Sequence, residues 1–244
     1  PDQATAYLLL AAALRAQGQT AVAQEVCRRA VELCPTSVEA WNNMSAILAA
    51  EGRLADAERA AQQAVTLGTQ EPVAWYNLGH ALHLQDRLGE AEVAYGRALQ
   101  LSPSYAKADY NRSIVLARLG RFDEAEAGYR RLLAADPGHV SAANNLGNLL
   151  LGKGRAGEAE AYYRQALVSS PDHLAARTNL SMAFLGLGRL GEAEQRLVEV
   201  LRDHPQSVEA AVALGKVYMA EGRIAEAEDV LARAAAARPD SPDL

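Results

Sequence analysis

The sequence lacks several features that would assign a function directly. Its longest apolar run, residues 7–14, is alanine-rich and far shorter than the roughly 20 residues that a membrane-spanning helix needs. The 24 bases and 30 acids give a net charge of −6, and no run of Lys and Arg offers a surface for nucleic acid. We therefore expect no membrane span, no nucleic-acid partner and a cytoplasmic location.

Cysteine and lysine are also scarce. Cys27 and Cys34 lie seven residues apart, which would separate them by about 10 Å along one helix. A disulfide needs Cα atoms within about 7 Å, so we expect two buried or half-buried free thiols. Nearly all the bases are arginine, and this bias, with the abundant alanine, indicates a bacterial source.

Proline, glycine and alanine recur with a fixed period of 34. Each type keeps its own phase along the chain: proline at 35, 103, 137, 171, 205 and 239; glycine at 18, 52, 120, 154, 188 and 222; alanine at 23, 57, 91, 125, 159, 193 and 227. Thr69 and Asp86 stand in the two vacant places of the proline and glycine series. A fixed period of this length is typical of a solenoid built from one repeated supersecondary unit.

The unit itself reads as a helical hairpin. From Val140 to Lys153 the apolar residues recur at helical spacing, and Gly154 can then adopt the left-handed conformation that ends a helix. A second periodic run, from about 157 to 169, closes at Pro171, which cannot continue a helix. Each unit is therefore predicted to be a helix, a tight turn, a second helix and a proline stop.

This pattern resembles the tetratricopeptide repeat (TPR). The residues that carry the resemblance in one repeat are Trp75, Leu78, Gly79, Leu82, Ala91, Tyr95, Ala98 and Pro103. The resemblance implies an all-α fold, a right-handed α-solenoid of seven 34-residue helical hairpins. The repeats would span 4–37, 38–71, 72–105, 106–139, 140–173, 174–207 and 208–241, as a single array over 1–244. We expect this array to be a fragment of a longer chain.

Two places depart from the pattern. The fourth repeat has Asp109 and Arg112 where apolar residues are expected, and their spacing predicts that they pair with each other. The run 7–14 is apolar nearly all round, which predicts packing on a preceding repeat or an apolar anchor at the end of the groove. Uncapped ends also predict self-association.

Asparagine recurs at the sixth position of five successive repeats, and we call this set the asparagine row: Asn43, Asn77, Asn111, Asn145 and Asn179. In the family, the first helix of each hairpin lines a concave groove, so the resemblance places this row on the ligand-binding surface. An amide side chain can both donate to and accept from a peptide backbone. Similar rows occur in the TPR superhelices of O-GlcNAc transferases and their bacterial relatives. The alternative is that the sixth position merely prefers a small polar residue.

The other groove positions complete the predicted peptide-binding site. They are Tyr76, His80, Lys107, Tyr110, Arg118, Asn144 and Asn148. Over the six groove-facing positions that the family has in each first helix, four bases (Arg15, Lys107, Arg118, Lys216) outnumber two acids (Glu39, Glu209). This excess favours an acidic, extended protein segment as partner.

The sequence gives little support for a metal site or a catalytic site. His80 and His83 share a helix face, but no third ligand follows, so we expect no metal and no other cofactor. The Glu-Ala-Glu runs, such as 158–160, are interpreted as solvated outer faces, not as catalytic acids. No phosphate loop or nucleophile elbow is present. We predict a protein-binding scaffold and no enzyme. The alternative is the substrate-recruiting domain of a larger bacterial enzyme, such as a glycosyltransferase, whose catalytic domain lies outside this chain.

Overall fold

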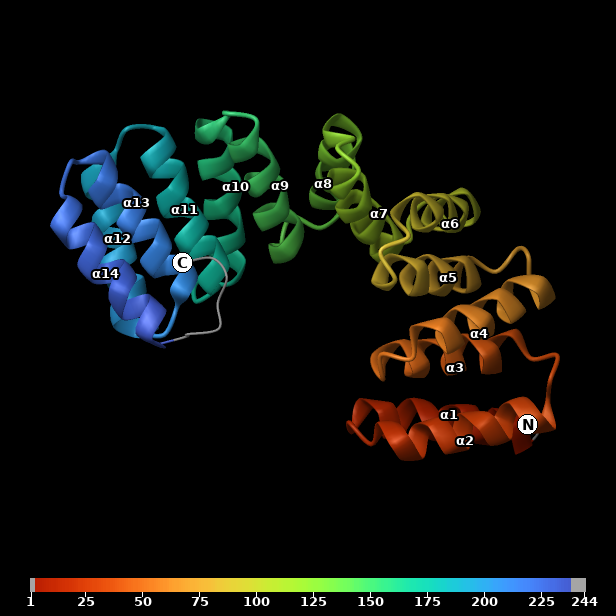
Figure 1. Cartoon of the computed structure of the whole chain (residues 1–244). Coiled ribbons are helices and arrows are strands. Elements are labelled where there is room, and N and C mark those ends of the chain that lie inside the picture. The colour runs from red at the N-terminus through yellow and green to blue at the C-terminus, as the bar shows by residue number, and fades with distance from the viewer. Residues whose placement is uncertain (1–2, 238–244) are drawn as a thin grey trace. The chain divides into compact units, whose positions relative to one another are not determined.

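The computed structural model describes residues 3–237, and this part of the chain forms fourteen α-helices and no strand (Figure 1). The first eight are α1 (Gln3–Ala16), α2 (Thr20–Leu33), α3 (Val38–Ala50), α4 (Leu54–Leu67), α5 (Pro72–Leu84), α6 (Leu88–Leu101), α7 (Ala106–Arg118) and α8 (Phe122–Ala135). The others are α9 (Val140–Gly152), α10 (Ala156–Ser169), α11 (Leu174–Gly186), α12 (Leu190–Asp203), α13 (Val208–Ala220) and α14 (Ile224–Ala237). The prediction of an all-α solenoid of helical hairpins is confirmed.

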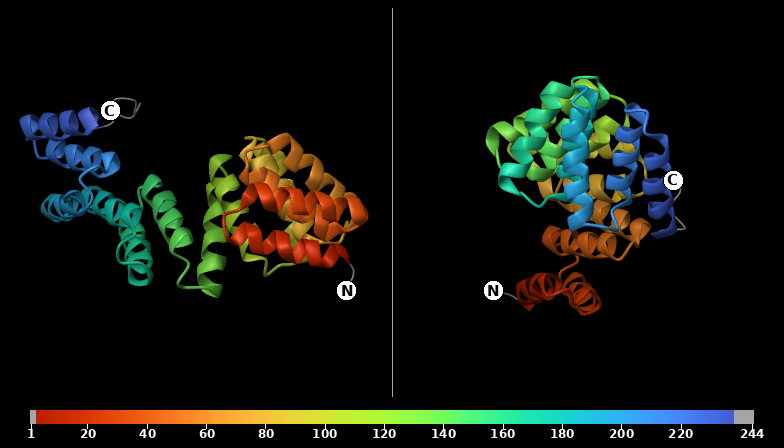
Figure 2. Two further views of the ribbon diagram at one scale, coloured as in Figure 1. Left: turned by 90° about the horizontal axis from the view of Figure 1, so that it is seen from below. Right: turned by 90° about the vertical axis from the view of Figure 1, so that its left-hand side faces the viewer.

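The helices gather into two compact units, Pro1–Gly128 and Tyr129–Leu244. In the first unit, the helices of each of the first three hairpins pack together, and the first helices α1, α3, α5 and α7 contact one another in sequence. Figure 2 shows the same ribbon from two further sides. In the second unit, α9, α11 and α13 do the same. First helices therefore form a continuous face within each unit, here called the first-helix face. A single array over both units stays a prediction.

The turn inside each hairpin follows from one left-handed residue. Gly154 has φ +74°, and the backbone N–H of Arg155 donates to the Leu150 carbonyl at 2.9 Å, which closes the end of α9. Asp86 takes the same conformation, with φ 64°, in the one hairpin whose turn lacks glycine. Aspartate tolerates this region better than most residues do. The periodic glycine position thus marks the turn even where glycine is absent.

Close packing inside the hairpins depends on small residues that face large ones. A Cβ atom added at Gly79 would come within 2.8 Å of the Tyr95 ring, and one at Gly147 within 2.5 Å of Tyr163. Both tyrosines are fully buried. The missing side chains let first and second helices approach closely enough to bury these rings.

The prediction that the Glu-Ala-Glu runs are solvated outer faces is wrong for the second acid of several runs. In runs 90–92, 158–160 and 192–194, and in the Asp-Ala-Glu run 56–58, the second acid is not a solvated residue. It is half-buried and pairs with an arginine 29 residues later in the chain. These inter-repeat ion pairs are Glu58–Arg87 (2.7 Å), Glu92–Arg121 (3.5 Å), Glu160–Arg189 (2.9 Å) and Glu194–Arg223 (2.9 Å). Each arginine also contacts the acid three residues after it, at 2.6 Å in every case.

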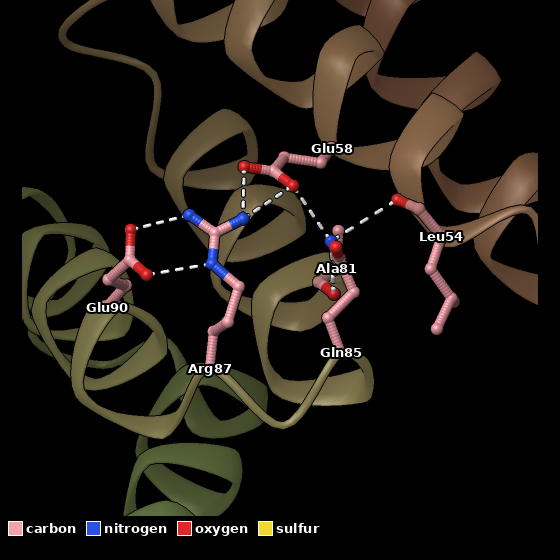
Figure 3. A network of polar contacts seen from close by, with 6 residues as sticks. All are labelled: Leu54, Glu58, Ala81, Gln85, Arg87 and Glu90. Atoms are coloured by element: carbon pink, nitrogen blue, oxygen red, sulfur yellow. Dashed lines mark hydrogen bonds and ion pairs between the residues drawn. The ribbon is translucent and has the colours of Figure 1, made fainter.

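Figure 3 shows one such network at the turn between α5 and α6. Arg87 holds Glu58 of α4 with one side of its guanidinium group and Glu90 of its own helix with the other. Gln85 donates to Glu58 at 2.9 Å from the same turn. An arginine can satisfy two carboxylates because its five N–H donors lie in a planar fork. The network therefore ties α4 to the following hairpin, and the equivalent pairs do the same for α6, α10 and α12.

Two other predictions meet different outcomes. Arg112 does not pair with Asp109, because it donates instead to Glu92 of α6, at 2.9 Å from Nε and 2.5 Å from Nη2. Asp109 itself is buried. Cys27 and Cys34 are free thiols, one buried and one half-buried, as predicted.

Candidate functional site on the first-helix face

The asparagine row lies on the first helices, and three of its amides donate hydrogen bonds to the preceding repeat. Asn77 donates from Nδ2 to the side-chain oxygen of Asn42 at 3.1 Å and to the Asn42 carbonyl at 3.3 Å. Asn111 donates to the Tyr76 hydroxyl at 3.2 Å, and Asn179 to Oδ1 of Asn144 at 3.0 Å. In each case the acceptor lies 35 residues earlier, at the fifth position of the previous repeat.

The members of the row differ in exposure. Asn77 is buried, and Asn43, Asn111, Asn145 and Asn179 are half-buried. Among the described residues, Asn43 has no side-chain hydrogen-bonding partner, whereas Asn145 accepts from Asn144 at 3.5 Å. The row therefore combines inter-repeat bonds with a partly accessible surface.

The amide oxygens of Asn77, Asn111 and Asn179 accept no hydrogen bond from the described part of the chain. The previous repeat holds the N–H side of each of these amides, which fixes the orientation of the amide group. This arrangement suits a ligand that offers N–H donors, as a peptide backbone does.

Aromatic rings surround the row in the first unit. The Tyr76 ring stacks on His80, with centroids 6.0 Å apart and planes 10° apart, and contacts Tyr105 at 5.2 Å. His83 meets the Tyr95 ring edge-on at 6.5 Å. Burial raises the pKa of Tyr76, with the Asn111 bond opposing it, and raises the pKa of Tyr105 to about 12. These hydroxyls therefore stay protonated at neutral pH.

The remaining predicted residues have varied surroundings. Lys107 is exposed, but the guanidinium of Arg118 is paired with Asp86 at 2.5 Å, so the predicted positive charge there is partly neutralised. Asn144 and Asn148 belong to α9; Asn144 is buried, and Asn148 accepts the Tyr163 hydroxyl at 2.7 Å. Tyr110 is half-buried on α7. The side chain of Arg15 lies outside the described residues.

Sequence reasoning missed the acceptors of the row. Asn42, Tyr76 and Asn144 were not recognised as partners, because they differ in type although they share the fifth position. The available signal was the constant offset of 35 between a polar fifth position and the next asparagine. Thr178 continues the fifth-position series, but the sixth position of the next repeat is Ala213, so its buried hydroxyl has no partner among the described residues.

Within residues 3–237, no three His, Cys, Asp or Glu side chains gather as a metal centre would require. No helix in this part of the chain has the length and apolar character needed to cross a membrane.

Comparisons with known proteins agree with the fold. Sequence profiles described as tetratricopeptide repeat match residues 4–47, 72–105, 110–173, 150–204 and 185–244, which together cover most of the chain. The chain belongs to the tetratricopeptide repeat family. A search of curated proteins gives no significant match.

Solved structures share this architecture at low identity. PilW, a widely conserved type IV pilus biogenesis factor, matches with a TM-score of 0.80 and 21% identity, over 88% of this chain and 100% of PilW. A chain of the APC/C hetero-tetramer Cut9–Hcn1 matches at 0.77 and 19% identity, over 97% of this chain. This chain spans 46% of that one. YrrB, a TPR protein with an unusual peptide-binding site, matches at 0.61 and 23% identity, over 75% and 94% of the two chains. These likenesses show the fold alone.

Proposed function

We propose that the chain is a protein-binding scaffold whose first-helix face holds an extended peptide through its backbone. The observation that carries the proposal is the geometry of the asparagine row. Asn77 and Asn111 have their N–H groups bonded to the previous repeat, so their amide groups keep a fixed orientation. Fixed acceptors bind at lower entropic cost than freely rotating ones. Recruitment of a substrate to a linked enzyme would use the same face.

Flanking side chains would set any preference among peptides. Tyr76 and His80 offer apolar ring surface beside the row, and Lys107 offers an exposed positive charge. Arg118 contributes less than the sequence suggested, because Asp86 pairs with it. We therefore infer a modest preference for acidic segments, of about 0.2–1 kcal/mol for each exposed pair.

The test uses peptides selected from a display library on the immobilised chain, with affinities measured by fluorescence anisotropy. Replacement of Asn43, Asn77 and Asn111 with Ala should weaken binding at least tenfold, because each lost neutral hydrogen bond costs about 0.5–1.5 kcal/mol. N-methylation of the peptide backbone should weaken binding as well, whereas changing peptide side chains should matter less. Acidic peptides should bind better than matched basic ones, and less so at 1 M salt.

Gln63→Ala, at an exposed position of the second helix α4, is the matched control and should leave affinity unchanged. Circular dichroism shows whether the triple variant stays folded. Asn43→Ala separates binding from stability, because Asn43 has no side-chain hydrogen bond to any described residue. A triple variant that keeps its helicity and its full affinity would show that the row does not bind the peptide.

A further inference from the structure

The seventh repeat contains a cavity of about 260 Å³ that has no role in the first-helix face. It lies between the end of α12, the turn that follows, α13 and α14. Leu201, Val208, Val230 and Ala234 give it apolar walls, and Pro205 lines it from the turn. Gln206, Ser207 and Arg233 add polar groups to its lining. Ala211, at the fourth position of the repeat, also lines the cavity.

Tryptophan occupies this fourth position in two earlier repeats. Trp41 donates its indole N–H to the Pro35 carbonyl at 2.8 Å, and Trp75 donates to the Thr69 carbonyl at 2.9 Å. Both rings pack against the buried core of their unit. The acceptor lies six residues before the tryptophan in each case, and the corresponding residue before Ala211 is Pro205. The small Ala211 side chain thus leaves open a corner that an indole ring closes elsewhere.

Other repeats with no tryptophan close the corner differently. In the fifth repeat, where Ala143 holds the fourth position, Gln165 of α10 donates to the Pro137 carbonyl at 2.9 Å. In the sixth, Arg177 takes the fourth position and pairs with Asp203 at 2.8 Å.

The seventh repeat has neither device. Arg233 stands at the position that Gln165 holds in the fifth repeat. It pairs with Asp229 on its own helix, and its side chain is 77% exposed. The Pro205 carbonyl receives no hydrogen bond from the described part of the chain. The cavity therefore keeps at its edge an acceptor, the Pro205 carbonyl, that no described residue of the chain uses.

We propose that this cavity binds the indole ring of a tryptophan from a partner protein segment. A dry cavity of about 150 Å³ in another protein accepts benzene, so the larger cavity here has room for a bicyclic ring. The Pro205 carbonyl would accept the indole N–H, as its counterparts accept those of Trp41 and Trp75. Aromatic anchors seated in such pockets dominate many protein interfaces. This site is independent of the asparagine row.

The experiment titrates the full chain with indole, N-acetyltryptophanamide and 1-methylindole, observed by NMR of the amide groups around the cavity. Indole and N-acetyltryptophanamide should shift the amide signals of residues 206–211 and 230–234 to saturation. 1-Methylindole should bind about three- to tenfold more weakly, because it cannot donate a hydrogen bond. Absence of saturable indole binding would overturn the proposal. Binding of indole without N-acetyltryptophanamide would reject a tryptophan side chain as the occupant.

Two variants fill the cavity, one from α13 and one from α14. If one variant fails to fold, the other still tests the site. Ala211→Trp and Ala234→Leu should each abolish indole binding while the rest of the spectrum keeps its dispersion. Trp75→Ala is the variant with the opposite expected effect. It should open the equivalent corner of the third repeat and so add a second indole site. Undiminished indole binding in both filled variants would place the ligand elsewhere and refute the assignment.

Discussion

Gly154 and Gly157 lie three residues apart and differ in what their backbone requires. Gly154 has φ +74°, whereas Gly157 lies inside α10, and both have open space where a Cβ would stand. Gly154→Ala should lower the free energy of unfolding by about 1–2 kcal/mol, because L-residues avoid the left-handed region. Gly157→Ala should leave it unchanged or raise it by up to about 1 kcal/mol. Urea unfolding measures both, and equal effects would contradict this explanation of the turn.

Thr178 stands at the fifth position of its repeat, where earlier repeats carry the inter-repeat acceptors, and its hydroxyl is buried. It has no hydrogen-bonding partner among the described residues, so Thr178→Val removes an unsatisfied polar group and keeps the shape. We expect the free energy of unfolding to rise by about 1 kcal/mol. Ser45→Ala is the control, because the Ser45 hydroxyl donates to the Ala57 carbonyl at 2.9 Å and its loss should destabilise the fold. A destabilised Thr178→Val protein would mean that the hydroxyl is satisfied in solution.

At the scale of single residues, the sequence predicted backbone features well and side-chain partners poorly. The period alone placed Asp86 in a turn, because every hairpin needs a left-handed residue at that point. It could not show that the Asn77 N–H is bonded to Asn42, because that bond depends on how two helices pack across 35 residues. Periodicity therefore located the asparagine row, and structure was needed to find which of its groups remain available.

At the scale of elements, α5 carries two histidines whose surroundings disfavour their charged form. Burial lowers the pKa of His80, and burial, Arg118 and His80 lower the pKa of His83, with Asp86 partly opposing. A folded-state pKa below the unfolded value of about 6.5 means that the unfolded chain binds more protons. The stability from the neutral rings is thus complete above pH 6.5 and is lost as pH falls through the folded-state values.

Urea midpoints at pH 7.5 and pH 5.5 should therefore differ more for the wild type than for His80→Gln/His83→Gln. The comparison uses this range because most carboxylates stay ionised in it and affect both proteins equally. Parallel pH dependence of the two proteins would show that these imidazoles do not couple to folding.

Helix positions were predictable from the sequence, but pairing between helices was less so. The spacing of Asp109 and Arg112 predicted a pair on one helix, yet Arg112 reaches Glu92 on α6. The i, i+3 rule counts neighbours within a helix and takes no account of a carboxylate on the adjacent one. Three Glu-Ala-Glu runs differ from their prediction for the same reason, since Glu92, Glu160 and Glu194 each meet an arginine from the next hairpin.

At the scale of the whole molecule, α1 presents two exposed leucines. Leu9 is 67% exposed and Leu10 48%, whereas Leu8 is buried. Exposed apolar neighbours favour association, so we expect the chain to self-associate in a concentration-dependent way through this helix. Sedimentation velocity of the wild type and of Leu9→Glu/Leu10→Glu tests this, with the variant expected to stay monomeric.

Leu8→Ala is the control for that experiment. It should destabilise the fold by about 2–5 kcal/mol, as truncation of a buried leucine does, and should leave association unchanged while the protein is folded. A wild type that stays monomeric at high concentration would rule out association through α1.

The constant spacing of the inter-repeat ion pairs has a consequence for the history of the gene. Glu58 meets Arg87 across the same 29 residues that separate Glu160 from Arg189. Unequal recombination that removes or duplicates any 34-residue stretch between such pairs restores the spacing at the junction. The chain can therefore gain or lose whole hairpins while the acids of these pairs keep an arginine partner. Its amides, tryptophans and cavity are not interchangeable in this way, so each change in length also changes what the protein can bind.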